Sequence, residues 1–77
     1  MTDFSIRSPL VGTVVAINVA PGDVVSKGTD LLVLESMKME FEVKAPRVGT
    51  IGEVHVAVGD QVDADHCLMS LQASQDE

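Results

Sequence analysis

The chain repeats its own pattern at a shift of 37 positions, which is the separation of Phe4 from Phe41. Further identities in this register are Pro9 with Pro46, Val11-Gly12-Thr13 with Val48-Gly49-Thr50, Val19-Ala20 with Val56-Ala57, and Gly22-Asp23 with Gly59-Asp60. One structural unit therefore occurs twice, and the two copies account for nearly the whole chain. Residues common to both copies are expected to be scaffold, and residues found in only one copy are candidates for function.

The abundance of valine and the regular spacing of turn residues favour β-structure throughout. The predicted strands are Phe4–Arg7, Gly12–Val19, Asp23–Ser26, Leu31–Ser36, Glu40–Ala45, Gly49–Val56, Asp60–Asp63 and Cys67–Leu71. Ala20-Pro21-Gly22-Asp23 and Ala57-Val58-Gly59-Asp60 are predicted to form equivalent tight turns, in which glycine supplies the backbone freedom. No segment of ten or more residues has an unbroken helical period, and Ala73–Glu77 is predicted to be a frayed polar tail.

A chain of 77 residues is near the lower limit for an independent core, so residues 1–77 are predicted to form a single domain. Four short strands in each copy cannot bury one face alone, whereas two copies packed together can. The predicted fold is all-β, a flattened antiparallel barrel or sandwich of two four-stranded halves related by a quasi-twofold axis.

The charge and composition exclude several classes of function. The net charge is −7 and only Phe4 and Phe41 are aromatic, which argues against nucleic acid as a partner. No stretch is long and apolar enough to span a membrane, and the N-terminus lacks the pattern of a signal peptide. The single cysteine, Cys67, cannot form an internal disulfide. These features predict a cytoplasmic protein, or the interior of an organelle if the chain belongs to a longer one.

The stretch Glu35-Ser36-Met37-Lys38-Met39-Glu40 lies at the junction of the two copies and breaks the repeat, because the partner of Lys38 would be Gln75. The β-patterns on either side predict a hairpin with Met37-Lys38 at its centre. Two-residue hairpin turns favour asparagine and glycine, since their central residues need positive φ. Methionine and lysine are poor choices for this geometry, so the turn is expected to be strained.

Two methionines that frame one exposed amine suggest that another enzyme must recognise and modify that lysine. Taken singly, an exposed lysine is usually a solvated charge, and a methionine usually fills a core. Their combination at the tip of a hairpin between two copies of a repeat favours a modified lysine, since a motif gains weight from its structural context.

The Glu-Ser-Met-Lys-Met-Glu stretch, the doubled Val-Gly-Thr and Gly-Asp segments and the total length resemble the biotinyl domain of biotin-dependent carboxylases. The resemblance covers essentially the whole chain, although Ser36 stands where the family more often has alanine. It implies that biotin is attached covalently to Lys38. It also implies that Met37 and Met39 are recognised by the ligase, with a weaker contribution from Glu35.

The same resemblance implies a carrier that is not itself an enzyme. A biotin protein ligase would acylate Lys38 from biotinyl-adenylate, because the sequence places no base beside the amine. Biotin would then shuttle carboxylate between the biotin carboxylase and carboxyltransferase sites of a carboxylase, and those subunits or domains would be the partners. The chemistry would belong to the cofactor and to the partner enzymes.

Two alternatives remain open at this point. A lipoyl domain has the same fold and a lysine at the same tip, but usually within Asp-Lys-Ala, whereas this chain has Met-Lys-Met. An unmodified interaction module could instead pack its hairpin against a partner. A metal site is disfavoured, because His55, His66 and Cys67 do not make a convincing ligand set.

Overall fold

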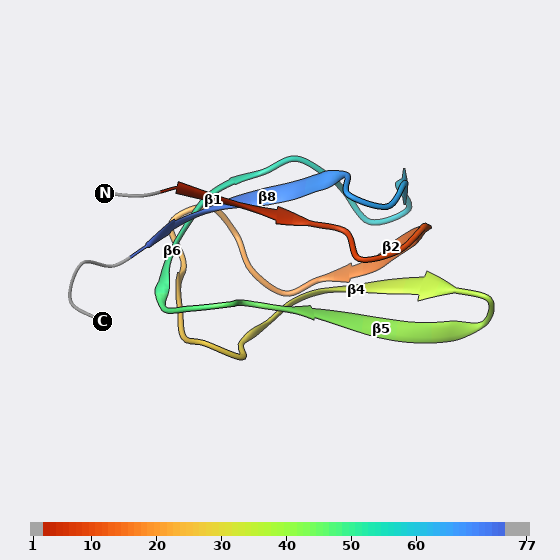
Figure 1. Ribbon diagram of the computed structural model, residues 1–77, viewed down its shortest axis with the longest axis horizontal. Helices are drawn as coiled ribbons and strands as arrows, with labels where there is room; N and C mark the ends of the chain where they lie inside the picture. The colour runs from red at the N-terminus through yellow and green to blue at the C-terminus, as the bar shows by residue number, and fades with distance from the viewer. Residues whose placement is uncertain (1–2, 74–77) are drawn as a thin grey trace.

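The computed structural model describes residues 3–73, which form two four-stranded antiparallel sheets (Figure 1). The strands are β1 (Asp3–Arg7), β2 (Gly12–Ile17), β3 (Val24–Val25), β4 (Asp30–Ser36), β5 (Met39–Lys44), β6 (Gly49–Val54), β7 (Gln61–Val62) and β8 (Cys67–Ala73). All eight predicted strands are present, and the described residues contain no helix. It follows that no helix of residues 3–73 could cross a membrane.

The two sheets are built by exchange of strands between the two copies of the repeat. The first sheet has the order β1-β8-β6-β3 and the second has the order β5-β4-β2-β7. The 37-residue shift converts β1, β8, β6 and β3 into β5, β4, β2 and β7, so it maps one sheet onto the other. The predicted all-β fold with quasi-twofold symmetry is confirmed. Each sheet nevertheless takes two strands from each copy, so neither copy is a sheet of its own.

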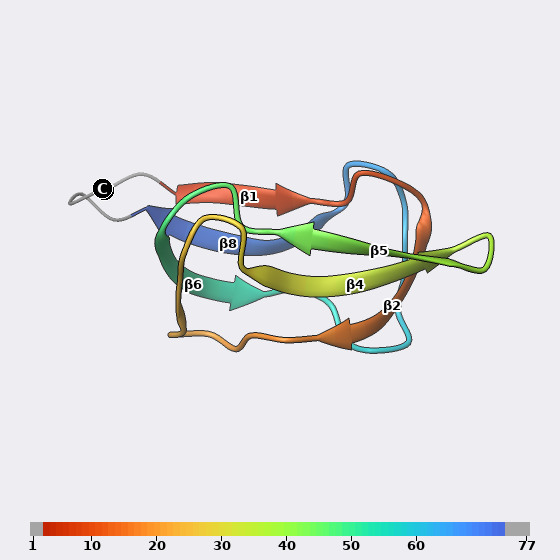
Figure 2. The same ribbon diagram turned by 90° about the horizontal axis from the view of Figure 1, so that it is seen from below.

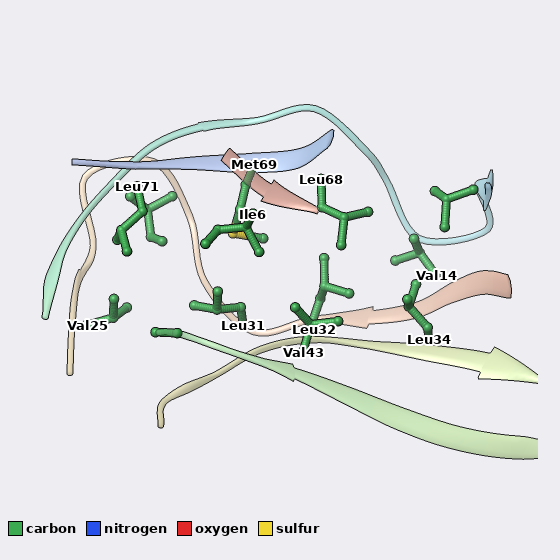
Figure 3. Packing of buried hydrophobic residues seen from close by; sticks show 13 residues of the cluster. Ile6, Val14, Val25, Leu31, Leu32, Leu34, Val43, Leu68, Met69 and Leu71 are labelled. Atoms are coloured by element: carbon green, nitrogen blue, oxygen red, sulfur yellow. The ribbon is translucent and has the colours of Figure 1, made fainter. Parts of the chain in front are cut away.

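The hydrophobic core lies between the two sheets and follows the same symmetry (Figure 3). Most of its buried residues form pairs across the repeat: Ile6 with Val43, Val14 with Ile51, Val25 with Val62, Leu31 with Leu68, Leu32 with Met69, and Leu34 with Leu71. Because every pair places one apolar side chain from each copy in a common interior, the two copies must fold together. Burial of large aliphatic side chains is the main source of stability in such a small domain.

The two predicted glycine turns are confirmed. Gly22 has a φ of 94° and Gly59 a φ of 99°, values that side chains larger than hydrogen rarely permit. In each turn the aspartate that follows the glycine closes the loop. Asp23 Oδ2 accepts a hydrogen bond from the Ala20 amide at 2.9 Å, and Asp60 Oδ2 accepts one from Ala57 at 2.9 Å. These aspartates therefore serve the turns, as predicted, and do not form an acid–base pair.

The repeated Val-Gly-Thr segments place glycine where two strands approach closely. A Cβ atom on Gly12 would lie 2.8 Å from the carbonyl oxygen of Glu35. A Cβ atom on Gly49, the equivalent residue, would collide with the carbonyl oxygen of Gln72, which is the repeat partner of Glu35. Glycine is required at both positions by sheet packing, because neither has a positive φ.

The end of the last strand differs from the prediction. Strand β8 continues to Ala73, which pairs with Gly49 and is buried. Ala73 therefore does not belong to a frayed tail, since it completes the ladder with β6 and covers the core. The rest of the predicted tail, residues 74–77, lies outside the described residues.

Candidate functional site

Strands β4 and β5 form a hairpin that projects from one end of the molecule (Figure 2). Its ladder runs outward from Leu34 opposite Phe41 to Ser36 opposite Met39, which leaves a turn of two residues, Met37 and Lys38. The described ends of the chain, at the start of β1 and the end of β8, lie at the opposite end of the molecule (Figure 1). The hairpin tip therefore extends beyond the other strands of the two sheets.

Both central residues of this turn have the predicted positive φ, 53° for Met37 and 67° for Lys38. Within residues 3–73 the only other non-glycine residue with positive φ is Asp65, whose repeat partner is Gly28. Aspartate tolerates this conformation better than most residues do, whereas methionine and lysine gain nothing from it. The strain predicted from the sequence is thus located at the candidate site.

The alternation of side chains gives the hairpin two different faces. The face that continues the core carries the pairs Leu34–Phe41 and Ser36–Met39, and beyond the core Met39 becomes 61% exposed. A small residue at position 36 fits there, because the side chain of Ser36 is half-buried. The other face carries Glu35 directly opposite Glu40, and both are exposed. Directly opposed like charges weaken a sheet, so packing does not explain this pair.

Glu35 was predicted from the sequence as a candidate site residue, whereas Glu40 was not singled out. The register of the hairpin brings the two carboxylates together beside the lysine turn. Strict alternation on either side of a two-residue turn could have revealed the pair, because it makes residues 35 and 40 cross-strand neighbours.

Lys38 differs from Lys44, the other lysine of the hairpin, in its surroundings. The Lys44 ammonium donates to Asp30 Oδ1 at 2.5 Å and lies 3.3 Å from Glu42 Oε1. The hydrogen bond to Asp30, and to a lesser extent the one to Glu42, raises the pKa of Lys44 above its usual value. Lys38 is exposed and forms no hydrogen bond or ion pair with any residue between 3 and 73. Its amine is therefore available to an enzyme that approaches the tip.

A chemical acylation experiment tests this difference between the lysines. An N-hydroxysuccinimide ester at limiting concentration and about pH 8 is expected to acylate Lys38 several-fold faster than Lys44, because bonded carboxylates keep the Lys44 amine protonated. Peptide mapping by mass spectrometry gives the rates. Lys27, which is exposed and likewise unpaired among the described residues, serves as the internal control. Equal rates for Lys44 and Lys27 would show that the Lys44 ion pairs do not persist in solution.

Replacing Met37 with asparagine tests the strain of the turn. Asparagine adopts positive φ readily, and the methionine side chain is 92% exposed, so no core contact is lost. M37N is expected to raise the melting temperature by about 2–6 °C, which corresponds to a gain of about 0.5–1 kcal/mol. M39N is the control, since asparagine is disfavoured within a strand and should bring no gain. An unchanged or lower melting temperature for M37N would contradict a strained turn.

The remaining candidates from the sequence do not form a site. His55 and His66 are exposed, Cys67 is half-buried, and no three potential metal ligands within residues 3–73 lie close together.

An open groove of about 330 Å³ lies between the edge strands β1 and β5. Its lining consists of four repeat pairs: Ser5 with Glu42, Ile6 with Val43, Arg7 with Lys44, and Pro9 with Pro46. Because both copies supply it equally, this groove follows from the scaffold.

Comparisons with known proteins agree with this geometry. The biotin/lipoyl family model, described as "Biotin-requiring enzyme", matches residues 5–71. The mitochondrial propionyl-CoA carboxylase alpha chain of Homo sapiens is 49% identical over 39 residues, which are 51% of this chain and 5% of that relative. The Caenorhabditis elegans alpha chain is 49% identical over 35 residues, which are 46% of this chain and 5% of that relative. The chain thus spans only a small part of these relatives.

Solved structures with the same fold come from other carboxylases. A single-chain, multi-domain long-chain acyl-CoA carboxylase matches with a TM-score of 0.89 at 30% identity, over 95% of this chain and 7% of that one. The Kluyveromyces lactis urea carboxylase matches with a TM-score of 0.87 at 25% identity, over 94% of this chain and 6% of that one. Both matches extend over nearly all of this chain and confirm its all-β architecture.

Proposed function

The chain belongs to the biotin/lipoyl family of biotin-requiring enzymes, and we propose that it carries biotin in amide linkage to the Nζ atom of Lys38. The observation that carries the proposal is the turn of the projecting β4–β5 hairpin, which holds Lys38 between two exposed methionines and leaves it without an ion pair among residues 3–73. The relatives and solved structures described above are carboxylases, which favours biotin over lipoate.

The residues of the tip fit covalent attachment of a prosthetic group. An acyl group on Lys38 would displace no ion pair or hydrogen bond of the described residues, and no buried atom would need to move. The base of the hairpin is anchored, because Leu34 is fully buried and β4 pairs with both β2 and β5. A flexible arm would therefore swing from a rigid support.

Biotin supplies a ureido nitrogen that accepts and releases carboxylate, while the partner enzymes supply the catalytic groups. The contribution of this chain is to hold the attachment point and to keep it accessible. We propose that its partners are a biotin protein ligase and the biotin carboxylase and carboxyltransferase units of a carboxylase. The tether would keep the loaded arm at high effective concentration near both active sites. We propose that the chain itself is non-catalytic, since no residue between 3 and 73 forms a hydrogen bond or ion pair with the Lys38 amine that could activate it.

The test is the intact mass of the protein after treatment with a purified biotin protein ligase, biotin and ATP, followed by peptide mapping. A gain of one biotin on Lys38 would establish the carrier. The same protein treated with a lipoyl ligase and lipoate is the comparison. A mass gain only in the lipoyl reaction would assign the chain to the lipoyl branch of the family. No gain in either reaction, with a folded protein by circular dichroism, would indicate an unmodified interaction module.

A further inference from the structure

Exposed large hydrophobic residues gather at the end of the molecule that carries Lys38. There are five such residues within positions 3–73: Val11, Val24, Met37, Met39 and Val58. Val11 directly precedes β2, which begins beside the outer end of β4, because Thr13 pairs with Glu35. The turn that contains Val58 is joined to the same end of β2 by a hydrogen bond from the Gly59 amide to the Val14 carbonyl at 2.7 Å. Only Val24 lies elsewhere.

The scaffold does not require an exposed valine at either position. Val58 is 63% exposed, and at the equivalent exposed turn position the first copy has a proline, Pro21, in place of valine. Val11 is 61% exposed, whereas its repeat partner Val48, in the equivalent loop at the opposite end, is half-buried. Val11 and Val58 will be called the apolar collar. Since the collar departs from the symmetry that governs the core, it is a candidate for function.

We propose that the apolar collar extends the surface to which the biotin protein ligase binds, beyond Met37 and Met39. The inference rests on the proposed function and adds two residues, far from the motif in sequence, to the recognition of Lys38. The ligase surface that fits is an apolar rim around the entrance of its active site. Met37 and Met39 would insert into the entrance of the ligase active site, and Val11 and Val58 would contact the surrounding apolar rim.

The length of the lysine side chain favours the ligase over the carboxylase as the occupant of this surface. Before modification, the amine of Lys38 extends only four methylene groups from the backbone. The enzyme that acylates it must therefore bring its active site close to the turn, and its rim then contacts the loops beside the hairpin. After modification, the biotin arm adds its own length, so a carboxylase can reach the cofactor without touching the collar.

The charge of the same end is complementary to an enzyme that handles an acyl adenylate. Glu35 and Glu40 face outward at the hairpin, and exposed Asp63 and Asp65 lie in the loop that follows β7. This loop is held at the end of β1 by a hydrogen bond from the Asp65 amide to the Ser8 carbonyl at 2.8 Å. A ligase that binds the phosphate of biotinyl-adenylate needs cationic side chains near its active site. An acidic surface around Lys38 would be attracted to them.

The experiment compares V11S, V58S and the double variant with V24S, which makes the same chemical change at a residue that is 76% exposed away from the hairpin. Biotinylation rates are measured with a purified ligase, biotin and ATP at several concentrations of the protein. We expect kcat/KM to fall about fivefold for each collar variant and more than about tenfold for the double variant, mainly through KM. V24S should keep the wild-type value, and all four variants should keep its melting temperature within about 2 °C.

The outcomes separate this inference from the proposed function. If the wild-type protein is not biotinylated, the proposed function fails. If it is biotinylated and the double variant reacts with an unchanged kcat/KM, the collar inference is overturned while the carrier stands. An effect that appears only when the biotinylated variants are carboxylated would assign the collar to the biotin carboxylase and overturn the ligase assignment. A wild-type dimer that the double variant loses in sedimentation would assign it to a second copy.

Discussion

Replacing Lys38 with arginine is expected to abolish biotinylation, because a guanidinium group cannot be acylated by the ligase under conditions that acylate an amine. K38R keeps the positive charge and the same backbone demands at a residue with a φ of 67°, so the fold should persist. Intact mass after exhaustive treatment with ligase should show no added biotin. Carboxylation by a partner biotin carboxylase should fall to background, and the melting temperature should change by less than about 2 °C.

The control for K38R is K44R. Lys44 lies in the same hairpin and is bonded to Asp30 and Glu42, so K44R should accept biotin at the wild-type rate. If K38R still gained the mass of one biotin, the attachment site would have to be another amine, and the assignment of Lys38 would be wrong. Partner-dependent activity that survives in unmodified K38R would instead favour the interaction module.

Replacing Gly49 with alanine is expected to cost about 3 kcal/mol of the free energy of unfolding. The added Cβ would collide with the Gln72 carbonyl and lie 3.1 Å from Leu71 Cδ1, so β6 and β8 would have to separate within the ladder. Chemical denaturation should show this loss, and the melting temperature should fall by about 10–20 °C. Biotinylation of the fraction that remains folded should be unaffected, because Gly49 lies in the opposite sheet from the hairpin.

The matched control is G59A. Gly59 has a φ of 99°, but nothing lies within 4 Å of the Cβ that alanine would add. The cost there is backbone strain alone, about 1–2 kcal/mol. If G49A were no more destabilising than G59A, the close approach between β6 and β8 would not be a packing constraint. G12A should resemble G49A in stability, and it would also disturb the hairpin, since the clash there is with Glu35.

The repeat and the turn residues were sufficient to predict most of the fold. Glycine followed by aspartate identified both turns, and valine-rich segments between regularly spaced turn residues identified eight strands, because these signals are local to a few residues. The hairpin at Met37 and Lys38 was predicted for the same reason, including its positive φ values. The family resemblance rested on the Glu-Ser-Met-Lys-Met-Glu stretch together with the doubled Val-Gly-Thr and Gly-Asp segments and the chain length, and the family match over residues 5–71 confirmed it.

The pairing between distant strands was beyond these local signals. Alternation shows which side of a strand is buried, but it does not show which strand lies beside it, so the exchange of strands between the copies was not foreseen. The burial of Ala73 follows from its pairing with Gly49, a contact that only the assembled sheet reveals. The exposure of Val11 and Val58 likewise depends on the surrounding fold, since valine in a β-rich sequence usually indicates a core position.

The pairing of β1 with β8 has a consequence for the timing of modification in the cell. Residues 3–7 find their ladder partners only among residues 67–72, so the first sheet cannot close until residues 67–72 have left the ribosome. The second sheet also waits for β7, which is synthesised well after Lys38. The lysine thus emerges early, but the surface that surrounds it is completed only after β7 and β8 have been synthesised. A ligase that recognises this surface would modify the folded domain and not the nascent chain.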